Sequence, residues 1–199
     1  METRTILLLV MVVAVIAQRL LELRIAERNR THALMQGAQE FGAGHYPLFV
    51  VLHTAWLLGW LLEGLGVIAT PRTMTFGDAL ALFEAFVLAQ GLRYWAIASL
   101  GSAWNTRILI IPGAERVRRG PYKWVNHPNY IAVAIELLAA PLIFGAWRTA
   151  LLASAANAVL LLAVRIPAEN AALRMMNDAQ HTTQHDQQRD TSPPNLPRS

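Results

Sequence analysis

Cysteine is absent from this sequence of 199 residues, which excludes disulfide bonds, thiolate zinc sites and thiol nucleophiles. Charged residues are scarce as well: they form 15% of the chain, whereas a soluble domain usually carries about 25%. Hydrophobic residues, by contrast, reach 54%, and the mean hydropathy is positive. This balance indicates a protein with several membrane-spanning segments.

The basic residues are almost all arginine, with sixteen Arg and a single Lys against 13 acidic residues. The formal net charge is +4, but no long cationic block with interleaved aromatic residues occurs. We therefore expect no nucleic-acid partner. The arginines are more informative about topology, because basic residues near the ends of spans collect on the cytoplasmic side.

Five apolar segments approach the length of about 20 residues that a helix needs to cross a bilayer. The first resembles the apolar core of a signal peptide, but no convincing small-residue cleavage site follows it, so we interpret it as a retained helix. The segments predict an all-α polytopic integral membrane protein with about five transmembrane helices and its termini on opposite sides. They lie at about 5–23, 47–68, 78–100, 130–147 and 149–166.

The connections between these segments differ sharply in positive charge. The connections on one side of the predicted membrane, together with the C-terminal tail, hold twelve Arg and Lys residues. The connections on the other side, together with the N-terminus, hold three. This difference predicts an N-terminus outside and a C-terminus in the cytoplasm. The richer set is Arg24, Arg28, Arg30, Arg107, Arg116, Arg118, Arg119, Lys123, Arg165, Arg174, Arg189 and Arg198, and the poorer set is Arg4, Arg72 and Arg148.

The chain divides into one membrane domain, 1–176, and a polar tail, 177–199. The tail is rich in Gln, His, Asp, Thr and Pro, and we expect it to be disordered. On the cytoplasmic side we expect a loop of about 23 residues after the first span and one of about 29 after the third. The second loop, with Trp104 and Trp124, is too aromatic for a linker, so we place the catalytic part at about 100–175.

The stretch 120–130 is the most informative, since it reads Gly-Pro-Tyr-Lys-Trp-Val-Asn-His-Pro-Asn-Tyr and leads into an apolar segment. Pro128 biases His127 away from the α region and suits a first helical turn, so the imidazole is expected near a helix N-terminus, which favours anions. Tyr122 and Tyr130 can supply hydroxyls or ring faces. The alternatives are helix capping by the histidine, an interfacial aromatic belt for the tyrosines and turn roles for the asparagines.

Two further pairs of residues carry candidate chemistry. Arg165 and Glu169 are four residues apart, which places them on one helix face at the cytoplasmic end of the last span. They are functional candidates, or a snorkelling Arg paired with its neighbour. In the loop, Arg107 could meet an anionic acceptor or set topology, and Trp104 could cover a cofactor or anchor the interface.

These motifs resemble those of the isoprenylcysteine carboxyl methyltransferase family. Its pattern is Gly-x-Tyr followed by Arg-His-Pro-x-Tyr-x-Gly, and this chain has Gly-Pro-Tyr at 120–122 and Asn-His-Pro-Asn-Tyr at 126–130. Asn126 stands in place of the family's Arg, and Ala132 in place of its Gly. Where the family commonly has a pair of Glu, this chain has Glu followed by Asn at 169–170. The resemblance covers about 100–175.

Residues 19–56 are similar to a bacterial branch of that family, whose members are often thought to methylate long-chain polyketides such as alkylpyrones. This similarity implies an integral protein of a bacterial cell membrane. The nearest alternative within methyl transfer is a phospholipid-type N-methyltransferase. An alternative of another class is a non-catalytic membrane transporter or adaptor, although five spans leave little room for a translocation path.

The resemblance implies an enzyme that uses S-adenosylmethionine to methylate an oxygen atom of a carboxylate or a hydroxyl group. The acceptor would be a lipophilic small molecule or a lipidated molecule, and membrane lipid would be a further partner. Its cofactor site would lie at the cytoplasmic face. The residues implied for cofactor binding are Trp104, Tyr122, Asn126, His127, Pro128, Tyr130 and Glu169. Those implied for catalysis are His127, Arg165 and Glu169, and those for the acceptor are Arg107 and Arg165.

Other titratable residues are open in their roles. A membrane-embedded acid needs a partner or water, which applies to Glu63, Glu84 and Glu136, and Glu136 could reach into the donor pocket. A zinc site is a weak hypothesis, because the eight-residue spacing of His45 and His53 matches no tight ligand pattern, and we expect no metal. The other acids near those histidines are Glu22 and Glu40. The acceptor's identity and the oligomeric state stay open.

Overall fold

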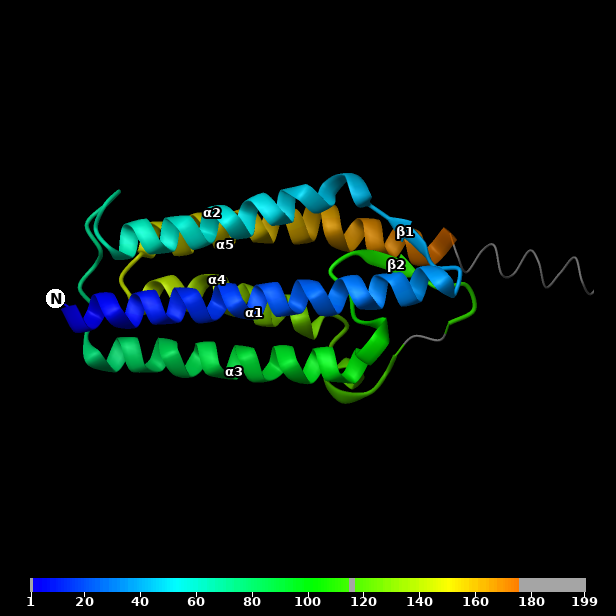
Figure 1. Ribbon diagram of the computed structural model, residues 1–199, viewed down its shortest axis with the longest axis horizontal. Coiled ribbons are helices and arrows are strands. Elements are labelled where there is room, and N and C mark those ends of the chain that lie inside the picture. Colours follow the sequence, from blue (N-terminus) through cyan, green and yellow to red (C-terminus); the bar gives the residue numbers. More distant parts are fainter. Residues whose placement is uncertain (1, 115–116, 176–199) are drawn as a thin grey trace, which may run out of the picture.

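A computed structural model describes residues 2–114 and 117–175, so the predicted disordered tail lies outside the described residues. The predicted all-α membrane fold is confirmed: five long helices run side by side along the molecule, and the only sheet of the described residues has two short strands (Figure 1). Strands β1 (Gln39–Phe41) and β2 (Ile108–Ile110) pair antiparallel. The helices are α1 (Glu2–Met35), α2 (Tyr46–Gly64), α3 (Phe76–Leu100), α4 (Pro128–Ile143) and α5 (Trp147–Val159), with short 3-10 turns η1 (Ala43–His45), η2 (Gly101–Ala103) and η3 (Gly120–Lys123).

Four helices are long and apolar enough to cross a membrane, and their helical stretches cover Glu2–Met35, Ala43–Gly64, Phe76–Ala103 and Trp147–Met175. The predicted span 130–147 forms the shorter α4, of 16 residues. It ends early because a tight turn follows, in which Gly145 N–H donates to Leu142 O (2.8 Å) and Ala146 N–H to Pro141 O (3.0 Å). At about 1.5 Å per residue, α4 is only about 24 Å long.

The first helix is longer than predicted. The expected span ends at 23 and is followed by a loop, but α1 continues to Met35. No Gly or Pro interrupts 24–35, and the helix stops where Gly37 adopts a positive φ of 81°. The predicted loop of about 23 residues is therefore wrong, and the arginines assigned to it lie on helix α1.

The last helix also continues beyond its predicted end. After α5, residues Leu160–Arg165 form a π-helical segment, η4, and the helix then continues to Met175. Such π segments inside helices occur frequently at functional sites. Arg165 is the last residue of η4, and Glu169 lies in the helical turn that follows.

The two ends of the bundle are different. The N-terminus and the connections 65–75 and 144–146 lie at one end (Figure 1). The connections 36–45, 101–114 and 117–127 lie at the other, together with the last turns of the helical stretch that continues α5 to Met175. We call this second end the loop end. All of the predicted site residues lie at the loop end. Successive helices run in opposite directions, so the connection after α3, the start of α4 and the end of the last helical stretch meet there.

The bundle core is built on large apolar side chains. Trp56 and Trp60 of α2 are fully buried with Leu8 of α1 and Leu137 of α4, and the Trp56 indole donates to the Leu137 carbonyl (3.1 Å). One embedded acid, Glu63, is also satisfied in the core. Its carboxylate accepts three hydrogen bonds from the N-terminus of α5, which are Thr149 N–H (2.8 Å), Thr149 hydroxyl (2.8 Å) and Arg148 N–H (3.1 Å). By contrast, Glu84 is exposed on α3.

Candidate functional site

The predicted site residues gather around one cavity at the loop end. This outer cavity has a volume of about 180 Å³. Eight of the nine predicted residues line it, and Pro128 is the exception, since it is buried as the first residue of α4. The eight are Trp104, Arg107, Tyr122, Asn126, His127, Tyr130, Arg165 and Glu169.

A chain of polar contacts joins α4 to η4 and the helical turn that follows it. Arg165 Nε donates to the Tyr130 hydroxyl (3.1 Å), and that hydroxyl donates to Glu169 Oε2 (2.9 Å). Arg165 and Glu169 thus meet through Tyr130, and no direct ion pair joins them in the described residues. The Tyr130 ring is stacked on the His127 ring, with the ring centroids 4.9 Å apart and the two planes at an angle of 4°. His127 Nδ1 lies 4.0 Å from the same Glu169 oxygen.

His127 occupies the N-cap position of α4, as its place before Pro128 predicts, but its side chain makes no capping hydrogen bond. The imidazole therefore lines the outer cavity instead of serving the helix. On the adjoining η3 turn, Gly120 has a φ of 58°, which favours glycine and lets the turn start beside Ser99. Burial and the Glu169 charge raise the pKa of Tyr122 to about 12, so Tyr122 offers a protonated hydroxyl.

Side-chain amides fix the 101–106 loop to helix α1. Asn29 donates to the carbonyl of Trp104 (2.8 Å), and Asn105 donates to the carbonyl of Ala26 (2.9 Å). Trp104 is consequently only 4% exposed, which does not fit an interfacial anchor. Its indole N–H is buried without a hydrogen-bond partner, as is Asn129 Oδ1, although both residues line the cavity. Such unpaired buried atoms suit a site that a ligand completes.

Arg107 has a carboxylate partner, Glu40, that lies far from it in the sequence. Its guanidinium lies 2.5 Å from Glu40 Oε1 and over the Tyr46 ring, with Cζ 4.3 Å from the centroid. The β1–β2 pairing aligns Glu40 with Leu109, close to Arg107. Burial raises the pKa of Glu40, but the hydrogen bonds and charges of Arg107 and Arg30 outweigh it and hold this pKa below its usual value. Arg107 lines the outer cavity with its charge already matched.

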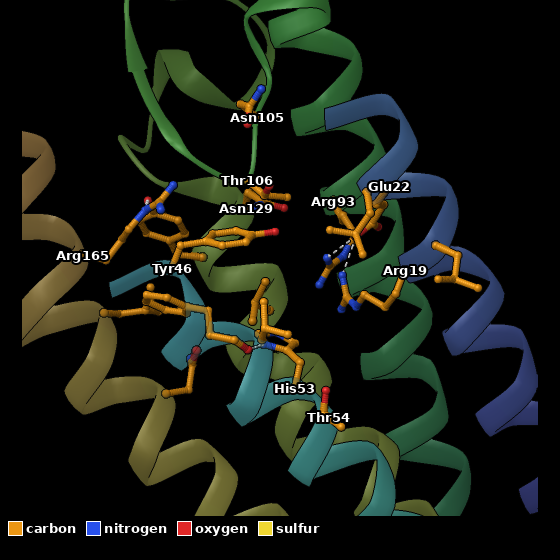
Figure 2. Close-up of a pocket in the computed structure, with 18 of the residues that line it drawn as sticks. Arg19, Glu22, Tyr46, His53, Thr54, Arg93, Asn105, Thr106, Asn129 and Arg165 are labelled. Atoms are coloured by element: carbon orange, nitrogen blue, oxygen red, sulfur yellow. Dashed lines mark hydrogen bonds and ion pairs between the residues drawn. The ribbon is translucent and has the colours of Figure 1, made fainter. Parts of the chain in front are cut away.

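A second cavity lies deeper, among the helices. This inner cavity has a volume of about 330 Å³ and mostly apolar walls. Figure 2 shows His53 of α2, Arg19 of α1 and Arg165 approaching it from different sides. The two cavities share five lining residues, so they meet at one junction. The shared residues are Trp104, Asn105, Asn129, Tyr130 and Arg165.

The inner cavity reaches the lipid-facing surface between α1 and α2. Leu20 of α1 and Val50 of α2 both line it, yet they are 53% and 49% exposed. Leu23, on the same face of α1 as Leu20, lines it as well and is exposed. The cavity wall is therefore continuous with the apolar outer surface of the bundle.

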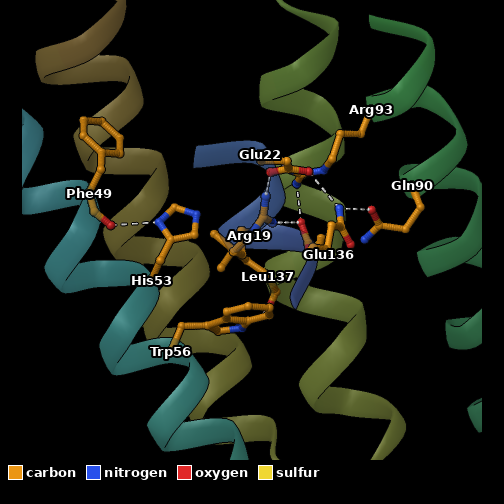
Figure 3. Close-up of polar contacts among 10 residues, drawn as sticks. Arg19, Glu22, Phe49, His53, Trp56, Gln90, Arg93, Glu136 and Leu137 are labelled. Carbon is orange, nitrogen blue, oxygen red and sulfur yellow. Dashed lines mark hydrogen bonds and ion pairs between the residues drawn. The ribbon is translucent and has the colours of Figure 1, made fainter. Parts of the chain in front are cut away.

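Four charged side chains form a compact cluster inside the bundle (Figure 3). Arg19 and Arg93 both contact Glu22 Oε2, at 2.6 and 3.2 Å, and both donate to Glu136 Oε2. Arg93 and Glu136 are 2% and 0% exposed. Two positive charges thus match two negative ones. Glu136 lines neither cavity, so the expectation that it reaches the donor pocket is wrong, and its partners are the two arginines.

Several cavity residues were not assigned a role from the sequence. The sequence could have indicated Arg19 and Arg93, because charged residues inside predicted spans are rare and usually have a functional or structural partner. The sequence offered little reason to select Asn129 or His53, since an asparagine in a turn or a histidine in an apolar helix is common. Nothing marked Asn157, which also lines the inner cavity. Among the described residues, no three His, Asp or Glu side chains gather to hold a metal ion.

This is a helical membrane protein in which a cavity of mixed polar and apolar lining at one end meets a mostly apolar cavity within the bundle. The model of the isoprenylcysteine carboxyl methyltransferase family matches residues 79–175, which include all nine predicted site residues. The chain is 42% identical to the uncharacterized protein YpbQ of Bacillus subtilis (strain 168), over 82% of this chain and 95% of that protein. It is 28% identical to an uncharacterized protein of Haemophilus influenzae (strain Rd), over 80% of this chain and 90% of that protein.

The chain belongs to the isoprenylcysteine carboxyl methyltransferase family. It is accordingly an integral membrane protein and a membrane methyltransferase.

Proposed function

We propose that the protein transfers a methyl group from S-adenosylmethionine to an oxygen of a lipophilic acceptor, with the donor in the outer cavity and the acceptor in the inner one. The observation that carries this proposal is the junction of the two cavities at Tyr130 and Arg165. A polar, water-soluble donor and an apolar acceptor can approach this junction from opposite sides.

The outer cavity offers groups that fit S-adenosylmethionine. The donor carries an ammonium, a carboxylate, ribose hydroxyls and an adenine, so its site needs an acid, hydrogen-bond donors and aromatic walls. Glu169 supplies the acid, and His127 can meet the carboxylate near the start of α4. The buried, unpaired indole N–H of Trp104 and Oδ1 of Asn129 stand ready for polar groups of the ligand.

Arg165 is the residue best placed to orient the acceptor. It is 8% exposed, it lines both cavities, and within the described residues no carboxylate lies within 4.0 Å of it. A buried guanidinium without an acid can hold an anionic or developing anionic oxygen. When bound, the donor supplies a sulfonium methyl group. The protein's own task is to align the acceptor oxygen with that group and to exclude water, for which the buried Trp104 and the half-buried Tyr130 provide walls.

The acceptor would enter sideways from the bilayer, through the opening between α1 and α2. Its chain would lie along Leu20 and Val50, and its oxygen would point to the junction. Alkylpyrones, the substrates suggested by the similarity to the bacterial branch, combine such an apolar chain with such an oxygen. The excess of arginine supports a loop end in the cytoplasm of a bacterial cell, with the N-terminus outside and the donor entering from the cytoplasm.

Calorimetry with S-adenosylhomocysteine tests the donor site in the purified, detergent-solubilised protein. We expect saturable binding that Glu169→Gln weakens at least tenfold, because a charged hydrogen-bond partner is lost. Glu27→Gln is the matched control, since Glu27 is 63% exposed on α1 and lies outside both cavities. Absence of binding to the unmodified protein would overturn the proposal.

A further inference from the structure

His53 lines the inner cavity and has no role in the function proposed above. Its Nδ1 lies 2.8 Å from the Phe49 carbonyl oxygen, one turn earlier on α2 (Figure 3). A carbonyl oxygen can only accept, so Nδ1 must carry the hydrogen. In the neutral imidazole this leaves a lone pair on Nε2, for which the described residues provide no hydrogen-bond partner.

The turn of α2 that carries His53 lies beside the junction of the cavities. The Phe49 ring centroid is 6.0 Å from Cζ of Arg165. His53 follows Phe49 by one turn, so it lies about 5 Å deeper along the axis of α2. In Figure 2 the imidazole stands below Tyr46 and faces the space between Arg165 and Arg19. His53 and the junction residues Tyr130 and Arg165 therefore line the same cavity, with His53 about one helical turn deeper than Phe49.

No other group on the inner cavity wall is a free base in the described residues. Glu22 accepts from Gln18 on one oxygen and from Arg19 and Arg93 on the other, which occupies the carboxylate. The guanidinium groups only donate, and the amide oxygens of Asn129 and Asn157 are not basic. The two other titratable residues implied for catalysis, His127 and Glu169, line only the outer cavity.

The ion cluster near His53 does not favour an acceptor that is already an anion. Arg19 and Arg93 are matched by Glu22 and Glu136, so this cluster has no excess positive charge, and Arg165 is the one unmatched arginine on the described inner cavity wall. A phenol or enol hydroxyl needs no such charge, but it must lose its proton to become a good nucleophile. A general base beside it typically contributes a factor of about 100 to 10,000 in rate.

We propose that His53 Nε2 is the general base of this methyltransferase and that the acceptor is a lipophilic phenol or enol, a proposal that rests on the function given above. The acceptor's O–H bond breaks and its proton goes to Nε2. Its oxygen forms a bond to the methyl carbon as the carbon–sulfur bond of the donor breaks, and that electron pair stays on sulfur. Atoms and charge balance, and His53 releases the proton when the product leaves.

The test compares two long-chain phenols as acceptors for labelled S-adenosylmethionine. One is a phenol with a pentadecyl chain, which is protonated at neutral pH. The other carries an additional nitro group, so that it is largely ionised at neutral pH. His53→Gln keeps an N–H for the Phe49 carbonyl but removes the base. We expect about a 100-fold loss of kcat with the plain phenol and less than about threefold with the nitrophenol.

His32→Gln is the matched control, because His32 is exposed on α1 and should change neither rate. Binding of S-adenosylhomocysteine to His53→Gln, unchanged from the unmodified protein, shows that the variant is folded. Equal losses with both phenols, or no methylation of the plain phenol by the unmodified protein, would overturn the role of His53. In both cases, methylation of hexadecanoic acid by the unmodified protein would leave the proposed function standing.

Discussion

The hydroxyl of Tyr130 donates a 2.9 Å hydrogen bond to Glu169, so that the first turn of α4 is tied to the helical turn that follows η4. The same hydroxyl accepts from Arg165, and the tyrosine ring stacks on His127. One side chain thus organises three of the residues proposed for donor and acceptor binding.

Tyr130→Phe is expected to keep the ring stacked on His127 and to lose both hydrogen bonds. Hydrogen bonds to charged groups contribute about 1.5–3 kcal/mol, so kcat/KM should fall by about tenfold or more. Steady-state methyl transfer measures this change. Tyr94→Phe is the matched control, because Tyr94 is 53% exposed on α3. Equal activity of the two variants would show that Tyr130 acts only through its ring.

Glu136→Gln is expected to destabilise the fold. It removes one carboxylate from between Arg19 and Arg93 and leaves buried positive charge unmatched. Breaking a buried ion pair in this way costs about 3–5 kcal/mol, which corresponds to a fall of about 10 °C in the thermal unfolding midpoint. Scanning fluorimetry in detergent measures it, with Glu84→Gln as the exposed control. Equal midpoints for the two variants would contradict the importance of the cluster.

The contact between Glu40 and Arg107 should make the β1–β2 ribbon sensitive to acid. The pKa of Glu40 lies below its ordinary value of 4.5 in the folded protein, so the stabilisation that its carboxylate gives the ribbon is complete above about pH 4.5. That contribution is lost as the pH falls through the folded-state pKa. Hydrogen exchange of the ribbon amides should therefore accelerate at acid pH in the unmodified protein. In Glu40→Gln the exchange rate, corrected for its intrinsic pH dependence, should not respond in this way.

Val50→Trp is expected to narrow the opening between α1 and α2. A bulky ring at this exposed wall of the inner cavity should raise KM for a long-chain acceptor by about tenfold or more, because a methylene group contributes about 0.8 kcal/mol when buried. Affinity for S-adenosylhomocysteine should not change. Leu152→Trp is the control, since Leu152 is exposed on α5 and outside both cavities. An unchanged KM would place the acceptor's entry elsewhere.

The sequence was sufficient to predict the helical membrane fold and the residues of the outer cavity. Long apolar runs report helices directly, and the motif around His127 and Pro128 combines a helix start with ring and hydroxyl groups at short spacing. Arg165 and Glu169 stood out as charges at the end of a span. These signals are local, so they can be read without knowing how the helices pack.

The inner cavity and the ion cluster could not be predicted in the same way. Their members come from different helices, and each contributes one or two side chains. Which of them meet depends on how each helix is rotated about its axis, as with Glu136 and its partners Arg19 and Arg93. The extension of α1 was missed because charged residues ended the apolar run, although they are good helix formers. The π segment before Glu169 had no sequence signal.

The proposed function can be tested in one assay, by measuring methyl transfer from labelled S-adenosylmethionine to a lipid extract by the purified protein and by Arg165→Gln. We expect a labelled lipophilic product with the methyl group on oxygen, and at least a 100-fold lower rate for Arg165→Gln. Arg148→Gln, whose side chain is outside both cavities, should be as active as the unmodified protein. A product methylated on nitrogen, or no labelled lipid from a protein that binds S-adenosylhomocysteine, would contradict the account.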